Sequence, residues 1–306
     1  MQDSDTRAPP MRAIGVDWGT THRRGYALAA DGSCVAEASD AMGLLAARGR
    51  FGSALDELLA TLSAREARVP MVLSGMVGSA SGWVDAGYLD APLPLAQLRR
   101  RLVCIDGARD VAVVPGVALR RGAAVDVMRG EETQLLGASA LGHRDGWFAL
   151  PGTHGKWVRL EGGAIVDFAT YLTGELFALL RAHGTLAAAM PAADDAPHDD
   201  GAFVEGVATA AAGAALSHDL FGVRARVVAG AMPAAQARSY LSGLLVGAEW
   251  GDLRRRCAGR LPGRVSIIGS AELVARHADA ARWFSVELQL LDARAVYLAA
   301  LAQLVG

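Results

Sequence analysis

The same succession of short apolar segments occurs twice in this chain, and this repetition constrains the fold more than any other feature. Near the N-terminus, three strands separated by tight turns are expected at residues 12–18, 23–29 and 33–38. Near the middle of the chain the pattern returns at residues 147–150, 156–160 and 164–169. The sequence therefore predicts a duplicated α/β architecture, with one copy in each half.

Helices and further strands complete each half. Apolar residues at helical spacing, or acidic residues in the first turn, predict helices. These helices are expected at 52–64, 131–141, 173–183, 202–216, 232–256 and 292–304. Additional buried strands are expected at 70–74, 111–114 and 264–268. A chain of 306 residues is long enough for two domains. We expect a disordered lead-in at 1–10, a first domain at 11–143 and a second at 144–289, with a final helix at 290–306 packing back on the first domain.

Composition excludes several classes of function. The net charge is −2, so binding to nucleic acid or to an anionic membrane has no electrostatic support. No apolar run reaches the roughly eighteen residues that a membrane span needs, and the first ten residues lack the apolar stretch of a signal peptide. The three cysteines are far apart and form no zinc or disulfide pattern. The expected location is cytoplasmic.

A first candidate phosphate loop follows the first predicted strand. It reads Asp17-Trp18-Gly19-Thr20-Thr21. The glycine permits close backbone approach, and successive N–H groups with two hydroxyls can donate to phosphate oxygens. Asp17 would be repelled by phosphate, but it can hold Mg²⁺ through water while the metal bridges phosphate oxygens.

A second loop with similar chemistry follows the first strand of the second series. Its residues Gly152, Thr153, His154 and Lys156 offer backbone, hydroxyl and charged donors. It is not a Walker A loop, because Trp157 stands where Ser or Thr is required. Lys156 is the only lysine among thirty basic residues. One phosphate loop in each half is the arrangement with which actin-like kinases hold a triphosphate.

Two adjacent acids begin the helix predicted at 131–141. Phosphoryl transfer to a hydroxyl requires positioning, a metal ion and a carboxylate that accepts the proton. Glu131 and Glu132 point about 100° apart on a helix, so only one of them can be that base. Helix-start chemistry alone also explains acids at this position. Arg129, just before them, either binds a substrate carboxylate or pairs with a glutamate.

Several motifs together resemble the 2-dehydro-3-deoxygalactonokinase family. They are VDWGTTHRR (16–24), SGMVGSASGWVDAGYL (74–89), VPGV (114–117), DVMRGEETQLLGA (126–138), LPGTHGKWV (150–158), FATYLTGELFALLRAHGTL (168–186) and LSGLLVGAE (241–249). RGEETQ and LPGTHxKW are specific, whereas DxGTT is shared by a whole superfamily. The chain departs from the family pattern at His22, Gly87, Gly155 and Gly184; the missing hydroxyl at 155 removes one expected phosphate contact.

The resemblance implies two duplicated ribonuclease H-like domains of the actin/hexokinase-like class with an interdomain cleft. It also implies ATP- and Mg²⁺-dependent phosphorylation of 2-dehydro-3-deoxy-D-galactonate to its 6-phosphate in galactonate breakdown. The substrate is a sugar acid, so its site needs a cation and several donors. The candidates are Arg24, Trp83, Tyr88, Arg129, Thr173 and Glu175. Gly269 and Ser270 match the place where this superfamily receives adenosine, and Glu272 is a further candidate there.

Other functions remain open at this point. One is a kinase for a sugar acid of different epimer configuration; a second is a non-catalytic nucleotide or carboxylate sensor of the same fold. An exopolyphosphatase-like hydrolase also places acids at a helix start, but the substrate-side motifs disfavour it. The apolar stretch 241–250 is either core or the surface of a homodimer.

Overall fold

The computed structural model describes residues 10–65, 67–107, 110–191 and 197–306, and these divide into two compact units. Unit 1 comprises Met1–Asp145, Arg159–Phe168 and Leu291–Gly306; unit 2 comprises Gly146–Val158 and Ala169–Leu290. Of the predicted lead-in at 1–10, all but the exposed Pro10 lies outside the described residues. The domain limits 11–143 and 144–289 stay a prediction.

Unit 1 contains the first predicted strand series. Its main sheet has the order β3-β2-β1-β4-β8-β7. These strands are β1 (Met11–Trp18), β2 (Arg23–Ala29), β3 (Cys34–Asp40), β4 (Met71–Gly75), β7 (Val103–Cys104) and β8 (Val111–Val113). The first three strands pair antiparallel, whereas β1, β4 and β8 pair parallel. The helices of this unit are α1 (Leu44–Ala47), α2 (Phe51–Thr61), α3 (Glu131–Ala140) and α10 (Ala293–Val305).

The second strand series repeats this order. The corresponding sheet runs β15-β14-β11-β12-β13-β6. Its strands are β6 (Leu93–Pro94), β11 (Gly146–Leu150), β12 (Gly155–Glu161), β13 (Ala164–Tyr171), β14 (Arg264–Ile267) and β15 (Glu287–Leu290). Both series share one arrangement. Three successive strands lie next to one another, and two further strands that run parallel lie on the other side of the first strand. This repeated order confirms the predicted duplicated ribonuclease H-like, actin/hexokinase-like architecture.

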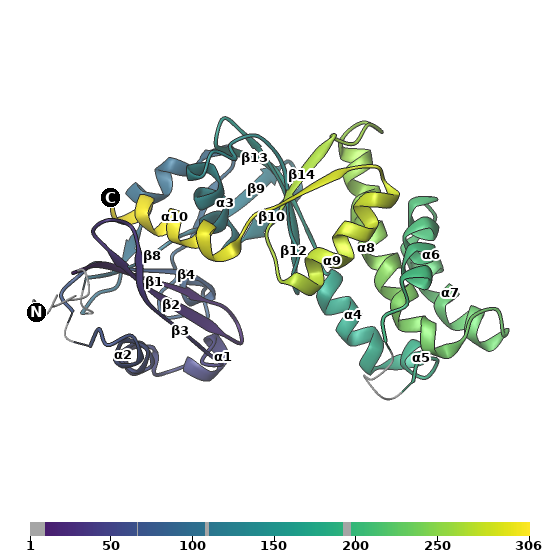
Figure 1. Ribbon diagram of the computed structural model, residues 1–306, viewed down its shortest axis with the longest axis horizontal. Helices are drawn as coiled ribbons and strands as arrows, with labels where there is room; N and C mark the ends of the chain where they lie inside the picture. The colour runs from purple at the N-terminus through teal and green to yellow at the C-terminus, as the bar shows by residue number, and fades with distance from the viewer. Residues whose placement is uncertain (1–9, 66, 108–109, 192–196) are drawn as a thin grey trace, which may run out of the picture. The chain divides into compact units, whose positions relative to one another are not determined.

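Most of the remaining elements of unit 2 are helices. They are α4 (Thr173–Ala182), α5 (Gly184–Ala187), α6 (Asp200–Ala211), α7 (Leu216–Val228), α8 (Ala237–Arg256) and α9 (Ala271–Trp283), shown in Figure 1. The helix predicted at 202–216 ends earlier than expected, because Gly213 is left-handed (φ 85°) and ends α6 before α7 begins. The helix predicted at 232–256 begins at Ala237, after Pro233 and a short 3₁₀ turn.

Sequence reasoning missed the third sheet of the structure, which lies in unit 1. It has the order β10-β9-β5 and consists of β5 (Tyr88–Asp90), β9 (Gly116–Arg121) and β10 (Ala124–Met128). Strands β9 and β10 pair antiparallel around a turn at Gly122. This hairpin directly precedes α3, and the two predicted catalytic acids lie at the start of that helix.

The two faces of strand β1 are covered by different helices. Ile14, Val16 and Trp18 point into a core that also contains Leu55 and Leu58 of α2. The alternate residues face α10, since a β-carbon on Gly15 would lie 2.8 Å from Leu301. Asp17 therefore belongs to the α10 face rather than to the apolar core beneath α2.

Helix α10 also packs closely on α3, and the two lie side by side in Figure 1. A β-carbon on Gly137 would be only 1.8 Å from the carbonyl oxygen of Val296. Glycine is therefore required where the two helix backbones meet. The C-terminal helix is in this way an integral part of unit 1.

The core of unit 2 lies between its sheet and α8. Trp157 of β12 meets Trp250 of α8 edge to face, with ring centroids 4.9 Å apart. The stretch 241–250 is almost wholly buried in α8. That stretch is therefore core, and it lends no support to a homodimer. Among the described residues, no helix is both long enough and apolar enough to cross a membrane.

The contact between α3 and α10 generates a stability prediction. Gly137→Ala should lower the free energy of unfolding by about 1–3 kcal/mol, because the added methyl group collides with the backbone of α10. Gly222→Ala in α7 is the matched control: nothing lies within 4 Å of its β-carbon, so better helix propensity should raise stability by up to about 1 kcal/mol. Chemical denaturation of both variants measures this, and equal effects would contradict it.

Candidate functional site

The first phosphate loop is a tight turn anchored on the start of α1. The N–H of Gly19 donates to the carbonyl of His22 at 2.9 Å, and the N–H of Leu44 donates to the carbonyl of Gly19 at 2.9 Å. Thr20 and Thr21 are exposed, and the Thr21 hydroxyl is 3.0 Å from Nδ1 of His22. The loop thus presents two hydroxyls to solvent on a fixed backbone, as a phosphate site requires.

Asp17 lies at the end of β1 among other charged groups. It is paired in register with Arg24 of β2, so the two side chains share one face of the sheet. Desolvation raises the pKa of Asp17 to about 6; Arg24 opposes the shift and the nearby charge of Glu131 adds to it. A divalent cation beside Asp17 would oppose this shift and favour the charged form of Asp17.

The two acids at the start of α3 occupy different environments. The preceding residue, Gly130, has φ 106°, and a β-carbon there would lie 3.3 Å from Cα of Gly75 at the end of β4. Glu132 is fully buried, and its carboxylate accepts from the N–H of Gly130 at 2.7 Å. Glu131 is partly exposed and accepts from the N–H of Arg129 at 3.1 Å. Of these two acids, only Glu131 is accessible to solvent.

Arg129 is a partly buried cation with unused hydrogen-bonding capacity. One terminal nitrogen donates to the carbonyl of Gly87 at 2.8 Å, and the guanidinium lies over the ring of Tyr88, 4.4 Å from its centroid. Nε and the other terminal nitrogen are buried and have no hydrogen-bond partner among the described residues. Unsatisfied buried donors are costly, so these two nitrogens are suited to a ligand's oxygen atoms.

Trp83 lies in a different setting from Arg129 and Tyr88. Its ring stacks on Phe51 of α2, with centroids 6.2 Å apart, and it packs against the core of unit 1. Packing accounts for these contacts, so a role for Trp83 in substrate binding stays a prediction.

In unit 2, the second phosphate loop is clamped by the start of α4. The N–H of Glu175 donates to the carbonyl of Thr153 at 3.0 Å, and its carboxylate lies 2.5 Å from Nε2 of His154. Lys156 is buried, and its ammonium donates to the carbonyl of His154 at 2.8 Å. The structure thus brings together His154 and Glu175, which the sequence analysis assigned to different ligands.

A cavity of about 450 Å³ opens beside this loop within unit 2. Four residues predicted to bind ATP or substrate line it, namely Gly152, Thr173, Ser270 and Glu272. Gly269 adjoins it, since a β-carbon there would be 3.0 Å from Pro151 of the loop. Its other walls come mainly from α8 and α9, with contributions from α4 and from the segment before α6. Sequence reasoning missed these lining residues: Phe177, His198, Arg238, Ser239, Ser242, Glu249, Arg276 and His277.

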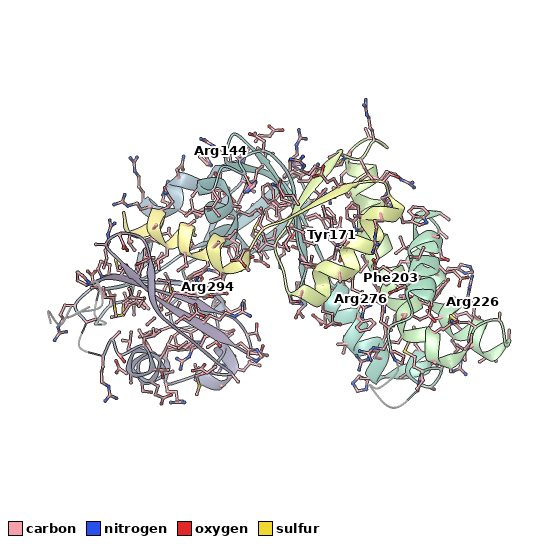
Figure 2. All side chains as sticks on the ribbon, viewed as in Figure 1. Arg144, Tyr171, Phe203, Arg226, Arg276 and Arg294 are labelled. Carbon is pink, nitrogen blue, oxygen red and sulfur yellow. The ribbon has the colours of Figure 1, made fainter. Side chains whose placement is uncertain are left out.

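The α9 side of the cavity combines a cation with a neutral histidine. Arg276, labelled in Figure 2, pairs with Glu272 one turn earlier at 3.7 Å. His277 is buried; desolvation lowers its pKa to about 4, and its Nδ1 has no hydrogen-bond partner among the described residues. The spacing of Glu272 and Arg276 on one helical face was the available sequence signal. An aromatic base with polar edges fits such a wall.

Known proteins resemble the chain over nearly its whole length. A family model described as 2-keto-3-deoxy-galactonokinase matches residues 17–304. A probable 2-dehydro-3-deoxygalactonokinase of Rhizobium meliloti is 41% identical over 258 residues, which is 83% of this chain and 82% of the relative. The 2-dehydro-3-deoxygalactonokinase of Escherichia coli is 34% identical over 270 residues, covering 88% and 89% of the two chains. The chain belongs to the 2-keto-3-deoxy-galactonokinase family.

Solved structures agree with this family and fold. A crystal structure from Sinorhizobium meliloti, provisionally named a 2-dehydro-3-deoxygalactonokinase, has a TM-score of 0.88 and 36% identity, covering 95% of this chain and 97% of that one. A more distant structure, the activator of 2-hydroxyisocaproyl-CoA dehydratase from Clostridium difficile, has a TM-score of 0.50 and 13% identity over 95% and 93% of the two chains. The latter likeness concerns the fold alone.

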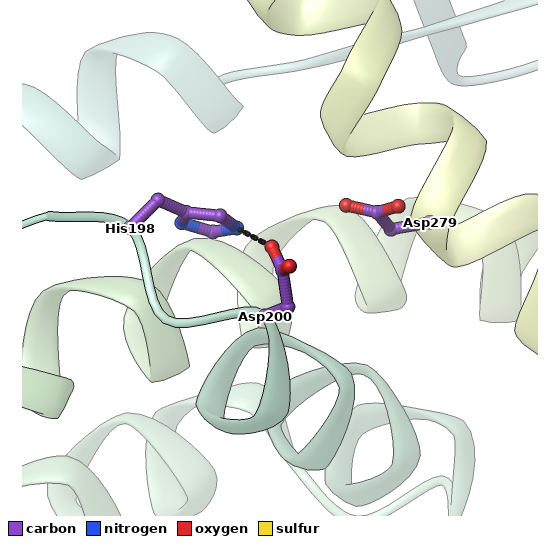
Figure 3. Close-up of side chains that lie close together, drawn as sticks. All are labelled: His198, Asp200 and Asp279. Atoms are coloured by element: carbon purple, nitrogen blue, oxygen red, sulfur yellow. Dashed lines mark ion pairs between the residues drawn. The ribbon is translucent and has the colours of Figure 1, made fainter.

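A second group of candidate metal ligands lies in unit 2, at one end of α6. His198, Asp200 and Asp279 each offer one ligand atom, all within 4.8 Å of one another (Figure 3). The His198 ring is 3.4 Å from Asp200 and 3.2 Å from the Ser239 hydroxyl, and Asp279 is paired with Arg282. Nδ1 of His198 and the carboxylate of Asp279 therefore already have internal partners, and we assign no metal to this group.

The burial of Glu132 predicts a pH dependence of stability. Desolvation and the charge of Glu131 raise the pKa of Glu132 from 4.5 to about 8. Between these values the unfolded chain has released a proton that the folded chain retains, so the free energy of unfolding falls as pH rises. Glu132→Gln mimics the protonated acid and should reduce the loss of melting temperature between about pH 5 and pH 8.

The exposed Glu161 supplies the control for this measurement. Glu161→Gln should leave the pH dependence of the melting temperature as it is in the wild type. A Glu132→Gln variant with the wild-type pH dependence would show that Glu132 is ionised in the folded protein.

Proposed function

We propose that this protein transfers the γ-phosphoryl group of ATP to the terminal hydroxyl of 2-dehydro-3-deoxy-D-galactonate, which yields the 6-phosphate and ADP. The observation that carries the proposal is at the start of α3, in a member of a kinase family. There a partly exposed carboxylate, Glu131, adjoins Arg129, whose guanidinium has two buried nitrogens without a hydrogen-bond partner among the described residues. A hydroxylated carboxylic acid would pair its carboxylate with Arg129 and place its hydroxyl group beside Glu131.

Unit 1 supplies the sugar-acid and proton-transfer functions in this proposal. The guanidinium of Arg129 pairs with the substrate carboxylate, and Tyr88 beneath it fixes the guanidinium plane. Arg24 adds positive charge on the same face as Asp17. The substrate hydroxyl oxygen attacks the γ-phosphorus, the bond from that phosphorus to the ADP oxygen breaks, and Glu131 accepts the hydroxyl proton.

Asp17 is the residue that we assign to Mg²⁺. Its carboxylate is desolvated and lies within the field of Glu131, so a cation would relieve an unfavourable concentration of negative charge. When bound, Mg²⁺ supplies charge neutralisation to the phosphate oxygens. Thr20 and Thr21 donate hydrogen bonds to the same phosphates, while Gly19, whose N–H is held by His22, permits their close approach.

Unit 2 supplies the nucleotide-binding functions. The cavity of about 450 Å³ has the size and the polar wall that a nucleoside needs, and the second phosphate loop forms one side of it. We assign the adenosine to this cavity, with Gly269 and Ser270 at its edge. The phosphates are bound by Gly152, Thr153, His154 and Lys156. The loop is held in place by Thr173 and Glu175. A cytoplasmic location accords with this function and remains a prediction.

The decisive experiment is a coupled assay of ADP release with Mg·ATP. We expect ADP only when 2-dehydro-3-deoxygalactonate is present, with the phosphate recovered on the terminal hydroxyl. The gluconate-derived epimer is the matched control, because it differs in the configuration of one hydroxyl. Faster turnover of the epimer would show that the epimer is the preferred substrate. ADP release without any sugar acid, or none with either, would overturn the kinase assignment.

The exposure of Glu131 predicts which acid is the base. Glu131→Gln should lower kcat by about 10²- to 10⁴-fold and leave the dissociation constant of ADP unchanged, because only the proton acceptor is lost. Glu132→Gln, its buried neighbour, should retain most of the turnover. An inactive Glu132→Gln together with an active Glu131→Gln would move the assignment by one residue.

A further inference from the structure

Glu249 is a buried acid that the proposed reaction does not use. It lies in the middle of α8 with only 2% of its surface exposed, and it belongs to the wall of the cavity beside the second phosphate loop. Its surroundings are otherwise apolar, since Trp157, Val246 and Trp250 pack around this part of α8. A carboxylate in such a place is costly unless specific partners use it.

The partners of Glu249 flank the phosphate loop in sequence. Oε2 accepts a hydrogen bond from Nε1 of Trp157 at 2.7 Å, and Trp157 directly follows Lys156, the last residue of the loop. The hydroxyl of Thr173 donates to the same carboxylate. Thr173 is the first residue of α4, the helix that clamps the loop.

The loop itself passes directly over the carboxylate. A β-carbon on Gly155 would lie 3.5 Å and 3.8 Å from the two oxygens of Glu249. The residue after Thr173 is in close contact with the other end of the loop, since a β-carbon on Gly174 would be 2.5 Å from the carbonyl oxygen of Gly152. One buried carboxylate thus connects the strand that leaves the loop to the helix turn that holds its beginning.

We propose that Glu249 is a positioning residue for ATP: through Trp157 and Thr173 it holds the loop Gly152–Lys156 in the conformation that receives the phosphates. This inference rests on the proposed function, because it assumes that the loop binds nucleotide. Burial raises the pKa of Glu249 to about 7, so its neutral form is accessible beside a polyanion. The carboxylate is occupied by two donors and does not itself contact phosphate.

The geometry specifies a selective effect on nucleotide binding. Glu249→Gln keeps the shape of the side chain but leaves only one acceptor oxygen for the two donors. It should therefore raise KM for ATP and the dissociation constant of ADP by about three- to tenfold. Glu249→Leu leaves the N–H of Trp157 without an acceptor, and we expect an increase of about tenfold or more. KM for the sugar acid should stay within about twofold in both variants.

Asp219→Asn is the matched control, because Asp219 is a buried acid of unit 2 that lies on α7. It should change neither KM. Glu249→Gln keeps the test valid if Glu249→Leu fails to fold, and near-UV circular dichroism checks the fold of each variant. Unchanged nucleotide constants in Glu249→Gln, or a parallel rise of both KM values, would overturn the positioning role. Wild-type protein that neither binds ADP nor phosphorylates a sugar acid would overturn the proposed function and this inference together.

Discussion

The packing of α10 against α3 and against β1 is the interaction on which the chemistry of unit 1 depends. Helix α10 follows the last strand of unit 2 in sequence, yet it covers the face of β1 that carries Asp17. Tyr297 of this helix is fully buried and lies 3.3 Å from the hydroxyl of Ser74 on β4. By excluding water from this face, α10 gives the acids there their raised pKa values.

Desolvated carboxylates recur beside the candidate loops of this protein. Asp17 is the next-to-last residue of β1, Glu132 is in the first turn of α3, and Glu249 lies beneath the loop that joins β11 to β12. Desolvation is the largest cause of the pKa shift in each case. Glu132 and Glu249 are both engaged by N–H or hydroxyl donors of neighbouring backbone and side chains. Glu132 and Glu249 thus fix local geometry, whereas Glu131 is partly exposed.

The sequence predicted the repeated strand series and the turns that carry the two candidate phosphate loops, because strand periodicity and glycine-rich turns are local signals. It could not separate Glu131 from Glu132, since their burial depends on how α10 covers α3. The cavity residues Arg238 and Arg276 were missed for a similar reason: they are brought together only when α8 and α9 pack beside the loop. The break between α6 and α7 was also missed, although Gly213 was a local signal for it.

Lys156 gives this protein an unusual chemical property. It is the only lysine in the sequence, its side chain is buried, and its ammonium donates to a carbonyl of the second phosphate loop. Acylating reagents directed at lysine side chains therefore have one target, and they reach it only when the loop opens. The rate of this modification would report the local opening of a single loop, without any engineered label.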